Sequence, residues 1–359
     1  MDHKRYFWLN WFIIISPHSL NTEHMVTVNE KSHHTSCHMH MHMHKQHLTS
    51  FTYHQLAMSN EPIIIKHSAS GASATVLPFG ATISSFINAE GHETLFLSKL
   101  AKLDGSKATR GGIPLVFPQF GQPNKDMPQH GFLRNNYWQC EQVNDEDLQA
   151  SCEFTLALKD VVNGRGEGMW KDESTVDCSV VFTVTVSEDS LTTILTIENV
   201  GNNQFDYQTL FHTYFKIEGG KALDKNVCNV SGLSGYKRLN QLTNNESVQG
   251  DEPIFIDGEV DCIFTPPEGK PAIEVEVTTG INSRVSVRAT AAVDGEIIPV
   301  SAVVWNPHIE KSKLMGDFGD EEYHDMICVE PGVLGSDEKL SAGKKVSFIQ
   351  KITTGTCTL

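Results

Sequence analysis

The chain has few basic residues, and its cysteines are not closely paired. Lys and Arg number 28 against 44 Asp and Glu in 359 residues, which gives a formal net charge of −16. Nucleic-acid surfaces need clustered Lys and Arg, so this deficit excludes a general nucleic-acid binder and requires any anionic ligand to find a local basic pocket. The eight cysteines include no C-x-x-C pair. They therefore favour buried thiols in a reducing compartment.

A run long enough to span a membrane as a helix is also missing from the amino-terminal region. The apolar segment YFWLNWFIII, Tyr6 to Ile15, is interrupted by Asn10, and a spanning helix needs about 20 residues. It resembles the core of a secretory signal, but no small-x-small cleavage site follows. We therefore expect no membrane partner and a cytoplasmic location, with secretory or organellar routing as the alternative.

Residues 1–59 differ in composition from the rest and are expected to form a disordered, low-complexity extension. HMHMHMH, from His38 to His44, carries donors that could bind copper, nickel or zinc adventitiously. No second shell is evident to fix a metal site, so no metal and no cofactor are expected. Met58 is a candidate initiator, because regular patterning begins just after it.

From Glu61 onward the pattern is that of strands. Short β-branched segments separated by glycines occur at 62–66, 74–78 and 82–88, and two long strands of period 2 occur between Ser174 and Val200 around a turn at 188–190. Further strands are predicted at 272–278, 284–289, 301–305 and 344–352. No amphipathic helix longer than two turns is evident. The chain is therefore predicted to be all-β, with one domain over 60–359 that forms a large antiparallel β-sandwich.

One histidine stands in an unusually apolar context. LFHTYF, residues 210–215, is typical of a buried strand, and it places His212 at the centre. A buried imidazole needs partners or a task. Either a hydrogen bond to a backbone carbonyl or a functional role would explain it, and the segment alone leaves both open.

Three other segments gather groups capable of chemistry. Arg110 precedes a double glycine that lets a ligand approach the backbone closely. Gln129, His130 and Arg134 lie within six positions of one another. Glu330 ends an apolar strand before Pro-Gly, where a raised pKa is expected. Each has an ordinary structural explanation when taken singly, such as a surface ion pair or a turn cap.

Two short matches to nucleotide-binding motifs are not accepted. Gly164 to Gly168 (GRGEG) lacks the spacing and context of a phosphate loop, and Asp317-Phe318-Gly319 stands without a kinase catalytic loop. Both are expected to be ordinary loop segments.

Five ordered motifs together carry a family resemblance. RGGIPLVFPQFG, PQHGFLRN, LFHTYF, VVWNPHIEKS and ICVEPG resemble the glucose-6-phosphate 1-epimerases (hexose-6-phosphate mutarotases) of the galactose-mutarotase-like superfamily. The resemblance spans about Glu61 to Thr353, and it implies a β-supersandwich.

The resemblance also implies the site residues. His212 and Glu330 correspond to the catalytic pair of the family, and the substrate-binding positions correspond to Arg110, Gln129, Arg134 and Asp261. Two departures occur: Cys262 and Phe264 replace the usual Arg and Tyr after Asp261, and Pro307-His308 stands where an aromatic residue is usual.

The implied reaction is anomer interconversion of a sugar phosphate by a monomer. Glu330 is expected to remove the C1 hydroxyl proton while protonated His212 protonates the ring oxygen, and the roles reverse on closure. Arginines at 110 and 134 are suited to a phosphate group. Alternatives are the same chemistry on unphosphorylated aldoses, a catalytically silent carbohydrate-binding protein and, with less support, a glycoside hydrolase, for which Glu330 has no plausible second carboxylate in the sequence. The preferred hexose 6-phosphate is not specified by these motifs.

Overall fold

The computed structural model describes residues 61–162, 164–165, 170, 175–335 and 338–356. The predictions made for the amino-terminal extension and for the GRGEG loop as a whole fall outside these residues. Among the described residues the helices are short: α1 (His308–Ser312) and the 3-10 turns η1 (Leu133–Asn135), η2 (Leu158–Asp160), η4 (Glu218–Gly220) and η5 (Glu322–His324). None of the helices in this part of the chain has the length and apolar character required to cross a membrane.

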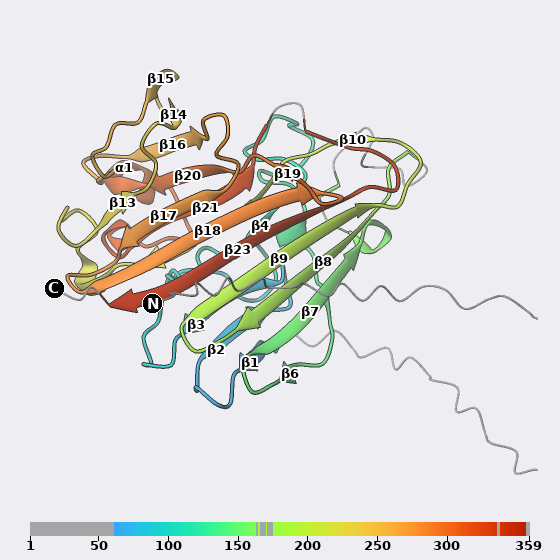
Figure 1. Ribbon diagram of the computed structural model, residues 1–359, viewed down its shortest axis with the longest axis horizontal. Coiled ribbons are helices and arrows are strands. Elements are labelled where there is room, and N and C mark those ends of the chain that lie inside the picture. Colours follow the sequence, from blue (N-terminus) through green and yellow to red (C-terminus); the bar gives the residue numbers. More distant parts are fainter. Residues whose placement is uncertain (1–60, 163, 166–169, 171–174, 336–337, 357–359) are drawn as a thin grey trace, which may run out of the picture. The chain divides into compact units, whose positions relative to one another are not determined.

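The larger of two main sheets has ten strands. Its longest strands lie side by side across the front of the view in Figure 1. In spatial order the strands are β13 (Asn229–Ser231), β17 (Ile273–Thr278), β18 (Ser283–Val293), β23 (Lys345–Thr356), β9 (Ser190–Asn199), β8 (Cys178–Val186), β7 (Ala150–Ala157) and β5 (Gln139–Cys140), with β19 (Glu296–Ile298) beside β18 and β6 (Asn144–Asp145) beside β7.

The second main sheet has eight strands and carries two of the predicted site residues, Asp261 and Glu330. Its order is β15 (Asn245–Val248), β14 (Lys237–Asn240), β16 (Val260–Thr265), β20 (Ser301–Asn306), β21 (Met326–Val333), β11 (Thr209–Phe211) and β4 (Leu115–Val116), with β12 (Tyr214–Lys216) also paired to β21. Two small sheets complete the described strands: β1 (Ile63–Lys66), β2 (Ser73–Leu77) and β3 (Thr82–Ile87), and the pair β10 (Phe205–Asp206) and β22 (Lys339–Leu340).

Every pairing between these named strands is antiparallel, so the predicted all-β antiparallel sandwich is confirmed. β8 shows why the sequence folds this way, because its residues alternate strictly between buried and half-buried. Period-2 alternation puts one face of a strand on the core. The main core lies between the two large sheets, where Phe211 of β11 and Phe348 of β23 stack with ring centroids 4.4 Å apart.

The opposite face of the eight-stranded sheet carries the site. Along β21, Ile327 and Val329 belong to the main core, whereas Cys328 packs in a separate cluster with Tyr214. Because successive side chains alternate between the faces of a sheet, Glu330 lies on the same face as Cys328. The side chains of Glu330 and Cys328 therefore lie on the side of this sheet that is turned away from the main core.

Candidate active site

His212 lies at a break between two strands that the sequence predicts as one. β11 ends at Phe211 and β12 begins at Tyr214, and the Thr213 N–H donates to the Phe211 carbonyl across His212. Such an i to i+2 bond is a three-residue turn. Phe211, the last residue before the break, falls opposite Pro331, which has no N–H to donate to the ladder. The prediction of one continuous strand over LFHTYF is therefore wrong, although the segment is buried as expected.

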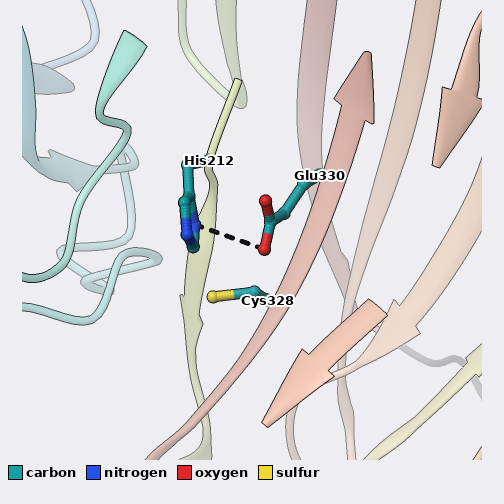
Figure 2. A group of neighbouring side chains, drawn as sticks. All are labelled: His212, Cys328 and Glu330. Carbon is teal, nitrogen blue, oxygen red and sulfur yellow. Dashed lines mark ion pairs between the residues drawn. The ribbon is translucent and has the colours of Figure 1, made fainter. Parts of the chain in front are cut away.

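The break preserves the register that brings the candidate pair together. Leu210 pairs with Gly332 and Tyr214 pairs with Cys328, so His212 falls opposite Glu330. The His212 Nδ1 atom lies 3.3 Å from Glu330 Oε1. The dashed line in Figure 2 marks this contact. The predicted pairing of these two residues is thus present in the geometry.

Both members of the pair are deeply buried, with exposures of 7% for His212 and 1% for Glu330. Burial, followed by the charges of Arg134 and Arg110, holds the pKa of His212 well below its usual value. Burial also raises the pKa of Glu330 well above its usual value, and Asp261 adds to that rise. The raised pKa expected for Glu330 is therefore present. Both shifts have the same main cause, because a dry environment disfavours the charged imidazolium and the charged carboxylate.

Aromatic rings fix the position of His212. The Tyr214 ring stacks on the imidazole at 4.7 Å between centroids with planes 9° apart, and Trp305 meets it edge-on at 6.0 Å. His130 approaches from another side at 5.6 Å, and its Nδ1 accepts a bond from the Gly121 N–H. Because Nδ1 of His130 is an acceptor, a neutral His130 carries its proton on Nε2. Rings on three sides leave His212 little rotational freedom.

Arg110 is held beside this cluster by two partners. Its Nη1 donates to the Tyr214 hydroxyl at 3.2 Å, and its Nε donates to Asp317 Oδ1 at 3.4 Å. Asp317 is almost fully buried, and Lys107 Nζ lies 2.8 Å from its other oxygen. These contacts fix the guanidinium in the orientation from which it can meet a ligand. Asp317 therefore has a positioning role that its loop sequence did not indicate.

Arg134 is half-buried and close to the same groups. Its Nη2 donates to the Gln129 backbone oxygen at 2.9 Å, whereas its buried Nε has no hydrogen-bond partner within the described part of the chain. Desolvation, with a further contribution from Arg110, lowers the pKa of Arg134 to about 10. The guanidinium remains charged at neutral pH. The Gln129 side chain is exposed, so its visible contribution is through the backbone.

Asp261 occupies the same face two strands away from Glu330. It lies on β16 opposite Trp305, and the Gln241 side-chain amide donates to its carboxyl group at 2.5 Å. Burial raises the pKa of Asp261, and Asp261 in turn raises the pKa of Glu330. The structure thus supplies a second carboxyl that influences Glu330, which sequence spacing did not reveal.

A sizeable cleft of the described structure lies elsewhere. It measures about 1060 Å³ and is lined by residues that include Asn88, Lys216 and Arg284, but by none of the candidate site residues. Its volume alone therefore does not locate the chemistry. The convergence of a buried acid, an imidazole and two arginines makes the face around His212 the better candidate.

Comparisons with known proteins agree on one group. The family model described as aldose 1-epimerase matches residues 62–353. A Cenchrus ciliaris protein provisionally named glucose-6-phosphate 1-epimerase is 32% identical over 289 residues, covering 79% of this chain and 81% of the relative. A protein with the same provisional name from Escherichia coli strain K12 is 25% identical over 292 residues, covering 81% and 89%.

Solved structures agree on the fold. A Salmonella typhimurium protein described provisionally as a mutarotase superposes with a TM-score of 0.65 at 22% identity, covering 82% of this chain and 90% of its own. A galactose-mutarotase-related enzyme from Lactobacillus acidophilus gives a TM-score of 0.60 at 15% identity, covering 83% and 98%. The galactose-mutarotase-like sandwich is therefore confirmed.

Proposed function

The chain belongs to the aldose 1-epimerase family, and on that premise we propose that it is a glucose-6-phosphate 1-epimerase, which interconverts the α and β anomers of D-hexose 6-phosphates. The names of its curated relatives support the reaction and the phosphorylated substrate. The observation that carries the proposal is the buried contact between His212 Nδ1 and Glu330 Oε1, at 3.3 Å, beside two arginines. An acid and a base side by side are what reversible opening of a hemiacetal needs.

The proposed reaction breaks the bond between C1 and the ring oxygen. Glu330, as carboxylate, removes the C1 hydroxyl proton while His212, as imidazolium, protonates the ring oxygen. Rotation about the C1–C2 bond then presents the other face of the aldehyde. Closure returns both protons, with Glu330 as acid and His212 as base. The chemistry requires no cofactor, and each proton transfer contributes about 10²–10⁴ in rate.

The pKa shifts of His212 and Glu330 favour the protonation states that the pair has after ring opening. After ring opening His212 is neutral and Glu330 is protonated, and this is the distribution that burial favours. A phosphate dianion beside the arginines would offset the charges that depress the pKa of His212. Substrate binding thereby favours transfer of a proton to the imidazole, which the opening half requires.

The proposal predicts a bell-shaped pH dependence for the free enzyme, because the pair works only with one proton shared between its members. Protonation of His212 at low pH gives two protons and sets the acid limb, which the depressed pKa moves downward. Deprotonation of Glu330 at high pH removes the proton and sets the alkaline limb, which the raised pKa moves upward.

The arginines support a phosphate ester over a free sugar. Arg110 is oriented by Tyr214 and Asp317, yet keeps N–H groups on both terminal nitrogens for a ligand. Arg134 is half-buried, and its Nε has no hydrogen-bond partner among the residues described here, which is costly unless an anion uses it. Planar guanidinium groups make paired bonds to phosphate oxygens. A neutral aldose would offer no anion to Arg134, whereas Arg110 already pairs with Asp317.

The test compares binding with turnover. Saturation-transfer NMR reports bound sugar, and magnetisation transfer between the anomeric protons reports exchange. We expect both signals with glucose 6-phosphate and weaker exchange with glucose. Binding without exchange would favour a silent carbohydrate-binding module instead, and equal exchange on both sugars would favour an aldose epimerase without phosphate preference.

We further propose that the working unit is a cytoplasmic monomer. All the candidate groups come from one chain, which supports a monomer. The six cysteines within the described residues are free thiols, as suits a reducing compartment. Sedimentation analysis and localisation of the tagged full-length chain test these two points.

A further inference from the structure

Cys328 is a buried thiol at the centre of the site that the proposed reaction does not use. It precedes Glu330 by two positions on β21, so both side chains project from the same face. Figure 2 shows its sulfur directed toward His212, beneath the contact between His212 and Glu330. One donor atom from each of the three residues lies within 4.8 Å of the others, and all three residues are buried.

These three donor atoms fit a zinc ion in kind and spacing. With Zn–N and Zn–O bonds near 2.0–2.2 Å and Zn–S near 2.3 Å, neighbouring ligand atoms of a tetrahedral site lie about 3.3–3.6 Å apart. The His212 Nδ1 to Glu330 Oε1 distance is already 3.3 Å. The Cys328 sulfur lies within 4.8 Å of the other two ligand atoms, so a side-chain movement of about 1 Å brings all three atoms to the spacing of a zinc site.

A second, independent observation points to a ligand. His212 Nδ1 and Glu330 Oε2 are both buried without a hydrogen-bond partner among the residues that the structure describes. Buried polar atoms are rarely left unsatisfied, and those that are call for an explanation such as an ion or a substrate. The sugar accounts for them in the working state, and a metal ion would satisfy them in its place.

We propose that His212, Cys328 and Glu330 form a Zn²⁺ site and that the bound ion reversibly inhibits the enzyme. Three protein ligands leave the fourth tetrahedral position open to water or to a sugar hydroxyl. The ion occupies the imidazole and the carboxylate that acid–base chemistry needs, so occupancy and turnover are mutually exclusive. This goes beyond the proposed epimerase activity, and its binding part does not depend on the identity of the sugar.

The charges around the site allow a cation despite the nearby arginines. Arg110 and Arg134 alone would repel it, but Cys328 and Glu330 bind the ion in their deprotonated forms and release their protons to solvent. The resulting thiolate and carboxylate offset both charges of the ion. Thiolate and imidazole ligands select Zn²⁺ over Mg²⁺ or Ca²⁺, which prefer sets of oxygen ligands. We therefore expect millimolar Mg²⁺ to leave activity unchanged.

The experiment uses the full chain and two matched cysteine variants. Cys328→Ala removes the proposed ligand, whereas Cys228→Ala removes a buried thiol in the main core. Co²⁺ serves as the spectroscopic probe, because thiolate ligation gives a charge-transfer band in the near ultraviolet. Zn²⁺ affinity is measured by competition with a chromophoric chelator. Cys37 and the HMHMHMH tract are present in all three proteins, so their contribution cancels in the comparison.

We expect the Co²⁺ band in the wild type and in Cys228→Ala, and its loss in Cys328→Ala. Losing a hydrogen-bond partner of a metal ligand already costs 10–100-fold in affinity, so losing the ligand should weaken the tight Zn²⁺ site by about 100-fold or more. Cys328→Ala should keep basal exchange activity and become resistant to Zn²⁺. Cys328→Ser provides the same comparison if the alanine variant does not fold.

Other outcomes would overturn the proposal. An identical Co²⁺ band and Zn²⁺ stoichiometry in Cys328→Ala would place all the bound metal elsewhere. Zn²⁺ binding to the site without any loss of exchange would refute the inhibition. An enzyme that shows no exchange at all would contradict the proposed function, but the Co²⁺ band would still test the metal site.

Discussion

Replacing Arg110 with glutamine separates recognition of the phosphate from the chemistry at C1. The side chain is 23% exposed and contacts Asp317 and Tyr214, whereas the proton-transferring atoms belong to His212 and Glu330. Asp317 keeps Lys107 at 2.8 Å in the variant, so no buried carboxylate is left unpaired. The substitution therefore removes a phosphate ligand with limited damage to the site.

The expected loss of kcat/KM follows from the N–H groups of Arg110 that remain available to the phosphate. A hydrogen bond to a charged group contributes about 1.5–3 kcal/mol net, and each 1.4 kcal/mol is a factor of ten. Losing one such bond should lower kcat/KM for glucose 6-phosphate by about 10- to 150-fold. The value for unphosphorylated glucose should change little, because glucose has no phosphate for Arg110 to bind.

Anomer exchange measured on both sugars gives the ratio of kcat/KM for glucose 6-phosphate to kcat/KM for glucose. This ratio shows whether Arg110 binds the phosphate. Arg284→Gln is the matched control, because Arg284 pairs with Glu276 on an exposed part of the ten-stranded sheet. We expect the control to keep the wild-type preference for the phosphate ester. If Arg110→Gln also keeps it, while remaining folded by circular dichroism, the assignment of Arg110 to the phosphate is refuted.

Three further predictions test the rest of the site. Glu330→Gln should lower kcat by about 10²–10⁴ while glucose 6-phosphate still binds by saturation-transfer NMR; unchanged turnover would remove Glu330 from the mechanism. Arg134→Gln should move both limbs of the kcat/KM pH profile upward, because the charge of Arg134 lowers the pKa of His212 and of Glu330; a downward movement would contradict this electrostatic account. Gly131→Ala should cost about 1–3 kcal/mol or more in urea unfolding, because Gly131 has φ +74° and a Cβ there would collide with the Phe117 carbonyl; an unchanged midpoint would disprove the strain.

The fold was largely accessible from the sequence because strand alternation is a local property. The hairpin of β8 and β9 was predicted within a few residues, since its alternation of buried and half-buried positions is regular. The break at His212 was not predicted, because it becomes evident only from the pairing of β11 and β12 with β21, a strand more than a hundred residues away. Pairing partners of that kind are invisible to a local pattern.

Only part of the site could be predicted from the sequence, because its geometry also depends on contacts between distant segments. His212 and Glu330 were identified through the family motifs, and the structure brings them together. Tyr214 could have been found, because it lies two positions after His212, where the alternation of side chains along a strand would put it on the same face. Asp317 could not, since its role depends on a long-range contact with Arg110 from a loop of ordinary composition.

The most direct test is magnetisation transfer between the anomeric protons of glucose 6-phosphate at equilibrium, with the wild type and with His212→Asn. We predict exchange well above the uncatalysed rate in the wild type, and a return to that rate in the folded variant. Exchange at the uncatalysed rate with folded wild-type protein would contradict the proposed epimerase activity. Full activity in His212→Asn would contradict the role of the His212–Glu330 pair.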